Sequence, residues 1–417
     1  MRILRLSKRT AGDLLAVRRR RDVAAEQTAA RILADVRRGG DRALLRWTGR
    51  LDGLRLTPGT LWVRPSEFRG ARREVSAEFV RAVRHAARNI RRVAERQKPG
   101  PWSFAVEPGV RVGQRIVPLE IIGCYIPGGR SSLVSTLLMT AIPAQVAGVR
   151  RIVVTCPRPN RALLAAASLL GVQEVARVGG AQAIGAMAFG TQSFPRVDKL
   201  FGPGNRYVNA AKRLVSSECA IDLPAGPTEV LILASRGDPR FIAADLLAQA
   251  EHDAQAVAFF VTTSAKLAQA VRQEVSRQRR TLPKTNPARV SLERNGVILL
   301  APSLAAGLHF ANEFAPEHLG LPGGEPALLE RVRSAGSVFL GPWSAQPLGD
   351  YSSGTNHVLP TSGWARARGG LSTWDFVKCS TVQRISRAGL RRLAPVVRAL
   401  ADAEGLVGHA RAVAVRQ

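Results

Sequence analysis

The sequence contains few cysteines, few aromatic residues and no cysteine pair of the CxxC type. Its 417 residues include four cysteines, which are widely spaced: Cys124, Cys156, Cys219 and Cys379. In a chain of this length, such spacing argues against a disulfide framework and predicts reduced thiols in a cytoplasmic protein. Cys156 follows the apolar run at residues 152–154 and is expected to fill space in a core.

Long apolar runs are also missing. No segment reaches the roughly 18 consecutive apolar residues that a membrane-spanning helix requires. The arginines at 18–21 are not followed by an apolar segment, as a secretory signal would require. Transit peptides are poor in acidic residues, so Asp13, Asp22 and Glu26 argue against one. These features predict a cytoplasmic protein without a membrane segment.

Acidic residues are scarce relative to basic ones. Lysine and arginine number 61 against 31 aspartate and glutamate residues, which gives a formal net charge of +30. A surplus of this kind is typical of nucleic-acid-binding proteins. Here the arginines are spread through every segment, aromatic residues make up only 5%, and no RNP, zinc-finger or homeodomain pattern occurs. A general arginine bias with nonspecific affinity for polyanions is the preferred interpretation.

The chain has no GxGxxG, the usual fingerprint of a dinucleotide-binding turn. It does have three glycine-containing turns that follow apparent strands. These are YIPGG at 125–129, GGAQA at 179–183 and FGPGN at 201–205. Glycine at such positions lets the backbone approach a phosphate closely.

Short apolar strands alternate with helical patterns from about residue 110 onward. Examples are RIVVTCP, followed by a helix at 161–170, and AVAFFVT, followed by a helix at 264–279. This alternation is typical of parallel α/β domains, and 417 residues are too many for one compact core. The sequence before this region predicts helices at 22–37 and 76–97, with Gly39 and Gly40 ending the first.

Residue types that carry chemistry gather in the last 40% of the chain. In DLLAQAEHD, Asp245 to Asp253, Gln249 and His252 are three residues apart and are predicted to project from one face of a helix. An amide oxygen and an imidazole placed in this way could hold a metal ion. Further along are PEHL (316–319), GDY (349–351), TNHVLPT (355–361) and EGLVGH (404–409).

With these motifs the sequence resembles the histidinol dehydrogenase family from about Ile32 to the C-terminus. The resemblance implies a zinc- and NAD-dependent oxidoreductase. Such an enzyme oxidises L-histidinol to L-histidinal and then to L-histidine, the last step of histidine biosynthesis. The implied fold is two Rossmann-like domains with incomplete parallel sheets, one inserted in the other, plus small N- and C-terminal helical segments.

The resemblance also implies roles for individual residues. His318 would be the general base for alcohol oxidation, and Glu317 would activate the water that attacks the aldehyde. One zinc ion per subunit would be held by Gln249, His252, Asp350 and His409. This donor set of neutral imidazoles and oxygens, without thiolate, is suited to zinc.

Substrate and cofactor contacts follow from the same resemblance. Besides the zinc ligands and His318, the expected substrate contacts are Thr228, His357 and Glu404, the last of which would hold the substrate imidazole. Thr228 lies in AGPTE, where the family usually has AGPSE, so the hydroxyl is retained with an added methyl group. The expected NAD contacts are Tyr125, Gln182 and Asn205.

The predicted organisation has four parts and a homodimer with composite active sites. Residues 1–22 form an N-terminal segment, residues 23–108 and 228–365 the principal α/β domain with the zinc and catalytic residues, and residues 109–227 an inserted α/β domain on the NAD side. Residues 366–417 form a C-terminal segment that reaches the active site of the partner subunit.

Two alternatives are compatible with the sequence. The first is a related zinc- and NAD-dependent dehydrogenase that acts on another small alcohol, such as a sulfonated diol. Glu404 favours a cationic or imidazole substrate over such a diol. The second is a nucleic-acid-binding protein that has lost catalysis, against which the intact zinc and acid–base residues argue.

Overall fold

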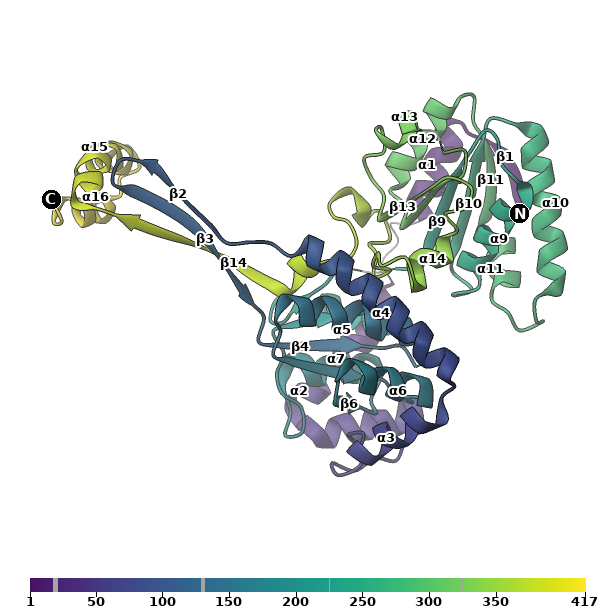
Figure 1. The fold of residues 1–417 in the computed structure, drawn as a ribbon, viewed down its shortest axis with the longest axis horizontal. Helices are drawn as coiled ribbons and strands as arrows, with labels where there is room; N and C mark the ends of the chain where they lie inside the picture. The colour runs from purple at the N-terminus through teal and green to yellow at the C-terminus, as the bar shows by residue number, and fades with distance from the viewer. Residues whose placement is uncertain (18–21, 129–131, 225, 325) are drawn as a thin grey trace.

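The computed structural model describes residues 1–17, 22–128, 132–224, 226–324 and 326–417. Two parallel α/β units lie side by side, and a narrow arm extends from one of them and carries the C-terminus at its far end (Figure 1). The arginine run at 18–21, Gly129 of YIPGG and Ala225 of AGPTE lie outside the described residues. No helix in the described part of the chain is long and apolar enough to cross a membrane.

The first unit is built on a six-stranded parallel sheet with the order β1-β11-β10-β9-β12-β13. Its strands are β1 (Arg2–Arg5), β9 (Glu229–Leu233), β10 (Val257–Thr262), β11 (Gly296–Leu300), β12 (His318–Leu321) and β13 (Ser337–Leu340). Its helices are α1 (Lys8–Val17), α9 (Pro239–Ala250), α10 (Ala265–Thr281), α11 (Ala288–Arg294), α12 (Leu304–Phe314), α13 (Pro326–Leu329) and α14 (Gln346–Tyr351).

Alternation along β9 shows how this sheet builds two cores. All five residues of β9 are buried, because helices cover both faces of the sheet. Val230 and Ile232 belong to the core on the side of α9 and α10, and Leu231 and Leu233 belong to the core on the side of α12. Successive strand residues point to opposite faces, so a continuous apolar run serves both cores.

The second unit is built on a five-stranded parallel sheet with the order β6-β5-β4-β7-β8. Its strands are β4 (Ile121–Tyr125), β5 (Arg151–Thr155), β6 (Glu174–Ala176), β7 (Lys199–Phe201) and β8 (Ala220–Ile221). Its helices are α2 (Val23–Asp52), α3 (Pro65–Glu74), α4 (Ala77–Gln97), α5 (Val134–Ala147), α6 (Arg161–Leu170), α7 (Gly180–Phe189) and α8 (Arg206–Val215). Two 3₁₀ helices, η1 (Trp364–Arg366) and η2 (Thr373–Phe376), follow later in the chain.

The predicted domain division is wrong at residues 23–108. Helix α2 packs against α7 and α8, α3 against α6, and α4 against α5, so these helices cover the five-stranded sheet and not the six-stranded one. The prediction also missed β1, which pairs with β11 at the edge of the six-stranded sheet. One α/β unit is nevertheless inserted in the other, because the five-stranded unit lies between β1 and β9 in sequence.

The arm is a three-stranded antiparallel sheet of β2 (Trp102–Glu107), β3 (Val110–Pro118) and β14 (Val377–Ile385). Strand β14 pairs with β3 along its whole length, from Val377 opposite Pro118 to Ile385 opposite Val110. Two helices, α15 (Arg387–Ala403) and α16 (Val407–Ala414), pack on each other at the end of the arm, away from both α/β units (Figure 1).

Candidate functional site

The predicted catalytic residues, Glu317 and His318, lie at the amino end of one strand of the six-stranded sheet, next to the amino end of its neighbour. His318 is the first residue of β12, and Glu229 is the first residue of β9. The strands are paired so that His318 lies opposite Val230. Glu317 and His318 are both buried, with exposed fractions of 7% and 3%. Pairing with β9 therefore fixes the backbone of this acid–base pair.

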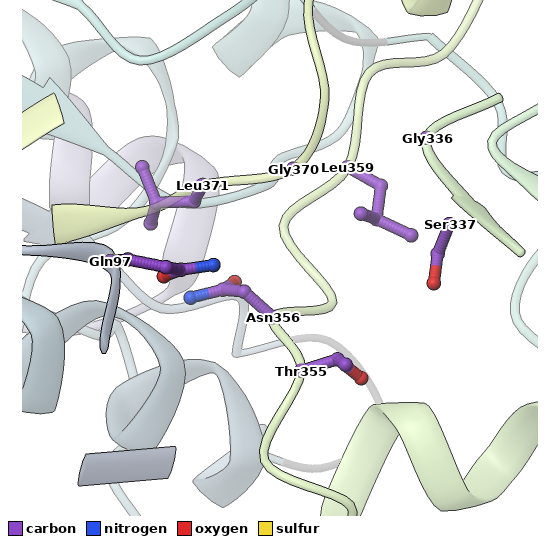
Figure 2. A pocket seen from close by; sticks show the side chains of 8 residues that line it. All are labelled: Gln97, Gly336, Ser337, Thr355, Asn356, Leu359, Gly370 and Leu371. Carbon is purple, nitrogen blue, oxygen red and sulfur yellow. The ribbon is translucent and has the colours of Figure 1, made fainter. Parts of the chain in front are cut away.

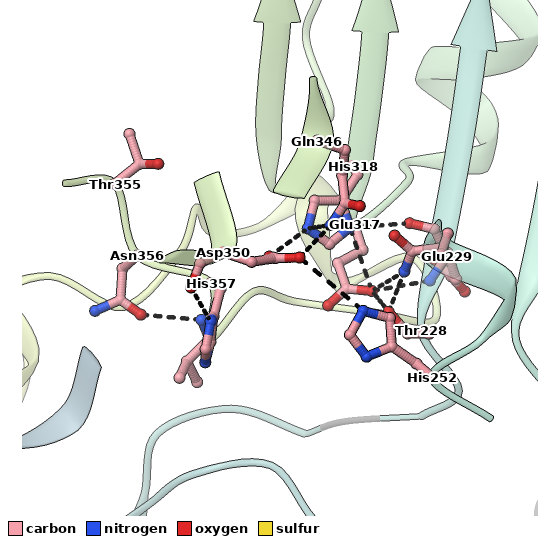
Figure 3. Close-up of polar contacts among 12 residues, drawn as sticks. Thr228, Glu229, His252, Glu317, His318, Gln346, Asp350, Thr355, Asn356 and His357 are labelled. Atoms are coloured by element: carbon pink, nitrogen blue, oxygen red, sulfur yellow. Dashed lines mark hydrogen bonds and ion pairs between the residues drawn. The ribbon is translucent and has the colours of Figure 1, made fainter. Parts of the chain in front are cut away.

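Glu317 receives hydrogen bonds from three directions (Figure 3). Its Oε2 accepts from the Thr228 hydroxyl, from the Glu229 amide at 2.8 Å, and from Nε2 of Gln249 at 3.5 Å. The Gln249 amide also donates to the Thr228 hydroxyl. Burial raises the pKa of Glu317, and the neighbouring His318 offsets part of this effect. Thr228 and Glu229 thus orient the Glu317 carboxyl group, and its buried position raises its pKa.

The tautomer of neutral His318 follows from its surroundings. Its Nδ1 lies 3.3 Å from the carbonyl oxygen of Glu229, which can only accept, so Nδ1 carries the proton. Its Nε2 then presents a lone pair toward Gln346 at 3.4 Å and Asp350 at 3.7 Å. Burial lowers the pKa of His318, but Glu317 and Asp350 outweigh it and raise this pKa above its ordinary value.

Three of the four predicted metal ligands come together. Nε2 of His252 lies 4.0 Å from Oδ2 of Asp350. Gln249 is fully buried beside them, and its Oε1 has no hydrogen-bond partner among the described residues. A buried amide oxygen without a partner is costly unless it meets a cation or water. The residues present therefore fit a metal ion as far as these three ligands go.

One detail of the ligand prediction is wrong. Helix α9 ends at Ala250, so His252 lies in the turn after the helix and does not share a helical face with Gln249. The Glu251 amide closes the helix by bonding to the carbonyl of Leu247. The two side chains still converge because this turn brings His252 back toward Asp350.

His409 and Glu404 are not part of this cluster. Glu404 caps the C-terminus of α15 and His409 lies in α16, a helix that the sequence analysis did not predict. Both helices are at the far end of the arm (Figure 1). Among the residues that the structure describes, no group of three or more His, Cys, Asp or Glu side chains could hold a metal ion. The four-ligand set is incomplete within one chain.

His357 connects the catalytic cluster to the five-stranded unit. Its Nδ1 lies 2.9 Å from the carbonyl oxygen of Asp350, and its Nε2 lies 3.2 Å from the hydroxyl of Thr136 in the first turn of α5. Burial lowers the pKa of His357. Helix α5 follows β4, so its first turn lies at the carboxyl end of the five-stranded sheet. This contact therefore brings the amino ends of the six-stranded sheet toward the carboxyl ends of the five-stranded sheet.

Two of the predicted cofactor residues, Tyr125 and Asn205, lie near the carboxyl ends of β4 and β7, and the third, Gln182, lies in α7 after β6. Strands β5 and β6 extend from β4 on one side and β7 and β8 on the other, so the strand order reverses between β4 and β7, where α/β sheets usually bind ligands. Tyr125 ends β4, and its hydroxyl accepts from the Gly180 amide at 3.2 Å. Asn205 is exposed and caps α8, while Gln182 is fully buried and bonds to Asp52 at 3.1 Å.

A separate pocket of about 150 Å³ is lined in part by Ser337, the first residue of β13. Gln97, Ser337, Thr355 and Asn356 contribute polar side chains to its lining (Figure 2). The Ser337 amide donates to the Glu317 carbonyl at 2.9 Å, so the pocket adjoins the backbone of the catalytic pair. No predicted catalytic or metal-binding residue lines it.

Gln346 is a site residue that the sequence analysis missed. Its Nε2 donates to Oδ2 of Asp350 at 2.6 Å and lies beside His318. The available signal was spacing, since Gln346 lies four residues before Asp350 and the two share a face of α14. That helix has six residues and was not predicted.

Known proteins match this chain over nearly its full length. The histidinol dehydrogenase family profile matches residues 16–417. The histidinol dehydrogenase of Methanosarcina barkeri is 46% identical over 398 residues, which cover 94% of this chain and 91% of the relative. That of Geobacillus kaustophilus is 48% identical over 393 residues, which cover 92% of each.

A solved structure agrees with the sequence relatives. The crystal structure of histidinol dehydrogenase from Elizabethkingia anophelis has a TM-score of 0.93 and is 37% identical, and the match covers 100% of this chain and 98% of that one. Agreement at this level extends to the arm and to both α/β units. The chain therefore belongs to the histidinol dehydrogenase family, whose members are oxidoreductases.

Proposed function

We propose that this enzyme oxidises L-histidinol to L-histidinal and then to L-histidine, reducing two NAD molecules at one site. The observation that carries the proposal is the buried pair of Glu317 and His318 beside Gln249, His252 and Asp350. This arrangement provides one base for an alcohol, one carboxyl group for water and a place for a cation.

The first oxidation uses the lone pair of His318. With Nδ1 donating to Glu229, Nε2 can take the proton of the substrate hydroxyl while hydride leaves the carbon for NAD. The C–H and O–H bonds break, and a carbonyl group and NADH form. A base placed in this way typically contributes about 10²–10⁴-fold to the rate.

The second oxidation uses Glu317. Its carboxylate takes a proton from a water molecule that adds to the aldehyde, and hydride then leaves the hydrated carbon for a second NAD. Thr228 and Glu229 donate to the same oxygen of Glu317, which fixes the direction of the other oxygen. A raised pKa brings this carboxyl group closer to neutral pH, where proton transfer is efficient.

Zinc is the proposed metal, held by Gln249, His252 and Asp350 of one subunit and His409 of another. The unpartnered Oε1 of Gln249 and the 4.0 Å approach of His252 to Asp350 support the first three ligands. When bound, zinc would hold and orient the amino alcohol. The same cation would weaken the effect of Asp350 on His318 and favour the neutral base.

NAD is the proposed hydride acceptor, bound where the strand order reverses at Tyr125 and Asn205. The turn at 202–205 follows β7 directly and leads into α8. Backbone amides at the start of such a helix favour a phosphate group. Gln182 would reach the cofactor only if its buried side chain changed partners from Asp52.

A homodimer with composite sites is proposed for two reasons. First, Glu404 and His409 lie at the end of the arm, outside the cluster that they are predicted to complete (Figure 1). Second, the arm and its helices expose large apolar side chains. These include Trp102 at 48%, Phe104 at 53%, Leu400 at 62% and Val407 at 75% exposure. Surfaces of this kind usually mark an interface between proteins.

We place this activity in the cytoplasm. The free cysteines support this location, since Cys124, Cys156 and Cys219 are buried thiols.

The test of the whole proposal is NADH formation with histidinol, histidinal and a panel of other small alcohols, including a sulfonated diol. We expect two NADH per histidinol. Turnover of another alcohol but not of histidinol would favour the related dehydrogenase.

A further inference from the structure

One buried ion pair holds both backbone groups of a single glycine. Lys212 and Asp222 have exposed fractions of 2% and 3% and are in direct contact with each other. Nζ of Lys212 donates to the carbonyl oxygen of Gly202 at 2.9 Å, and Oδ2 of Asp222 accepts from the Gly202 amide at 2.8 Å.

Gly202 opens the turn at 202–205 and has a conformation that only glycine adopts easily. Its φ is +106°, and a Cβ atom at this position would come within 2.2 Å of the carbonyl oxygen of Tyr125. The turn therefore lies directly against the end of β4. A side chain at this position would therefore force the turn away from β4.

Helix α8 holds the turn that precedes it at two points. Asn209 donates from Nδ2 to the carbonyl oxygen of Gly204 at 2.9 Å, and Lys212, three residues later, holds Gly202. Residues three apart share one face of a helix. The cap by Asn205 adds a third contact, because its Oδ1 accepts from the Tyr207 and Val208 amides at 3.0 and 3.1 Å.

Stability alone does not account for this ion pair. A buried pair of charges costs so much desolvation that apolar residues of similar volume often serve equally well. Hydrogen bonds from charged groups are, however, shorter and stronger than neutral ones, and they fix geometry. The charges of Lys212 and Asp222 are directed at the turn itself and at the Leu223 amide, which donates to Asp222 at 2.6 Å.

We propose that Lys212 and Asp222 are positioning residues that shape the turn at 202–205 for binding a nicotinamide dinucleotide. The inference rests on the proposed function, which puts NAD at this strand end. Neither side chain needs to touch the dinucleotide, since both are buried beneath the turn. We expect their effect to fall mainly on the cofactor, because Glu317 and His318 are held by the other sheet.

The double variant Lys212→Met/Asp222→Asn tests the proposal. It removes both charges together, so no unpaired charge is left buried, and the asparagine oxygen can still accept from Gly202. We expect KM for NAD to rise about ten-fold or more, since a displacement of about 1 Å can cost up to about 100-fold. KM for histidinol and kcat at saturating NAD should stay within about two-fold. Lys284→Met, at an exposed lysine of the other unit, is the matched control.

A milder double variant, Lys212→Gln/Asp222→Asn, covers the case in which the first double variant does not fold. It also leaves no unpaired charge buried, and it keeps an amide donor on the side of Lys212, so it should show the same pattern with a smaller rise. Equal increases in KM for NAD and histidinol, or a loss of kcat alone, would overturn the inference. So would an unchanged KM for NAD in a folded variant.

Direct titration of NADH by its fluorescence separates this inference from the proposed function. If the unmodified enzyme does not bind NADH, the proposed cofactor is wrong. If it binds NADH and the variants bind it equally well, the cofactor stands and the positioning role of Lys212 and Asp222 is wrong.

Discussion

The side-chain amide of Gln346 lies between the carboxylate of Asp350 and the imidazole of His318. Its Nε2 is 2.6 Å from Oδ2 of Asp350 and 3.4 Å from Nε2 of His318. An amide nitrogen has two hydrogens and can donate to both groups. It therefore donates toward the lone pair of the proposed base, although Oδ1 of Asp350 lies 3.7 Å from Nε2 of His318 as well.

Gln346→Leu should lower the rate of alcohol oxidation at neutral pH by about 10- to 100-fold. Without the amide, which donates to both groups, the carboxylate of Asp350 acts more strongly on His318 and raises its pKa further, so less of the neutral base is present at a given pH. The midpoint of the pH–rate profile for kcat/KM should move to higher pH. The control is Gln278→Leu, at an amide on α10 that bonds to the Arg240 carbonyl. An unchanged midpoint and rate would show that Gln346 has no such role.

Glu317→Gln should separate the two oxidations. Glutamine preserves the acceptor for the Glu229 amide but cannot take a proton from water. We expect histidinal oxidation to fall by about 10²–10⁴-fold and histidinol oxidation to fall far less. Single-turnover assays that start from each compound measure the two steps. Equal losses in both steps, with Glu330→Gln behaving as the unmodified enzyme, would contradict the assigned role.

Removing the metal should abolish turnover, because Gln249, His252 and Asp350 cannot orient the substrate alone. Dialysis against a chelator, metal analysis and stepwise return of zinc measure this dependence. Activity should return with about one zinc ion per subunit, as one four-coordinate site requires. Full activity in protein verified to be free of metal would rule out the proposed site.

Two inactive variants should restore activity when mixed. His409→Ala damages the ligand on the arm, and His252→Ala damages the ligand in the cluster. In a mixed dimer with composite sites, one site carries both lesions and the other carries neither. After random exchange of equal amounts, activity should reach about a quarter of that of the unmodified enzyme. If subunits are shown to exchange and no activity returns, the arm serves its own subunit.

Asp245→Asn should stabilise the protein above pH 6. Burial raises the pKa of Asp245 to about 6, against 3.8 for an ordinary aspartate carboxyl. A hydrogen bond from the backbone N–H of Gln346 offsets part of this effect. The folded state thus binds a proton more tightly than the unfolded state, and the cost of ionisation develops as pH rises from about 4 to 6. It amounts to at most about 3 kcal/mol at pH 8. In thermal unfolding, the variant should have a higher Tm than the unmodified protein at pH 8 and the same Tm at pH 4.

Local structure in the α/β units was predictable because its signals are local. The sequence predicted a helix at 161–170, and α6 spans those residues, with Asn160 capping its start and Gly171 in the left-handed region after its end. The predicted break after the first long helix is a kink at Gly40, which has a φ of 50°. Caps and glycine breaks act on their immediate neighbours, so the sequence suffices to identify them.

The assignment of elements to units was not predictable in this way. Strand β1 pairs with β11, which is almost 300 residues away in the chain, and β14 pairs with β3. Periodicity tells which face of an element is buried but not against which partner. The arm strand β2 has five exposed residues out of six, so it lacks the alternation that would mark it as a strand.

The sequence by itself determined the family, since DLLAQAEHD, PEHL, GDY and EGLVGH carry the predicted acid, base and metal ligands in short segments. Only the tertiary structure decided how these groups act on one another. Pairing of β12 with β9 sets the tautomer of His318 through the Glu229 carbonyl, and α14 places the amide of Gln346 beside both Asp350 and His318. The arm takes His409 away from its own cluster. Hydrogen-bond direction and local charge depend on distances between segments that are remote in sequence, and these distances exist only in the folded chain.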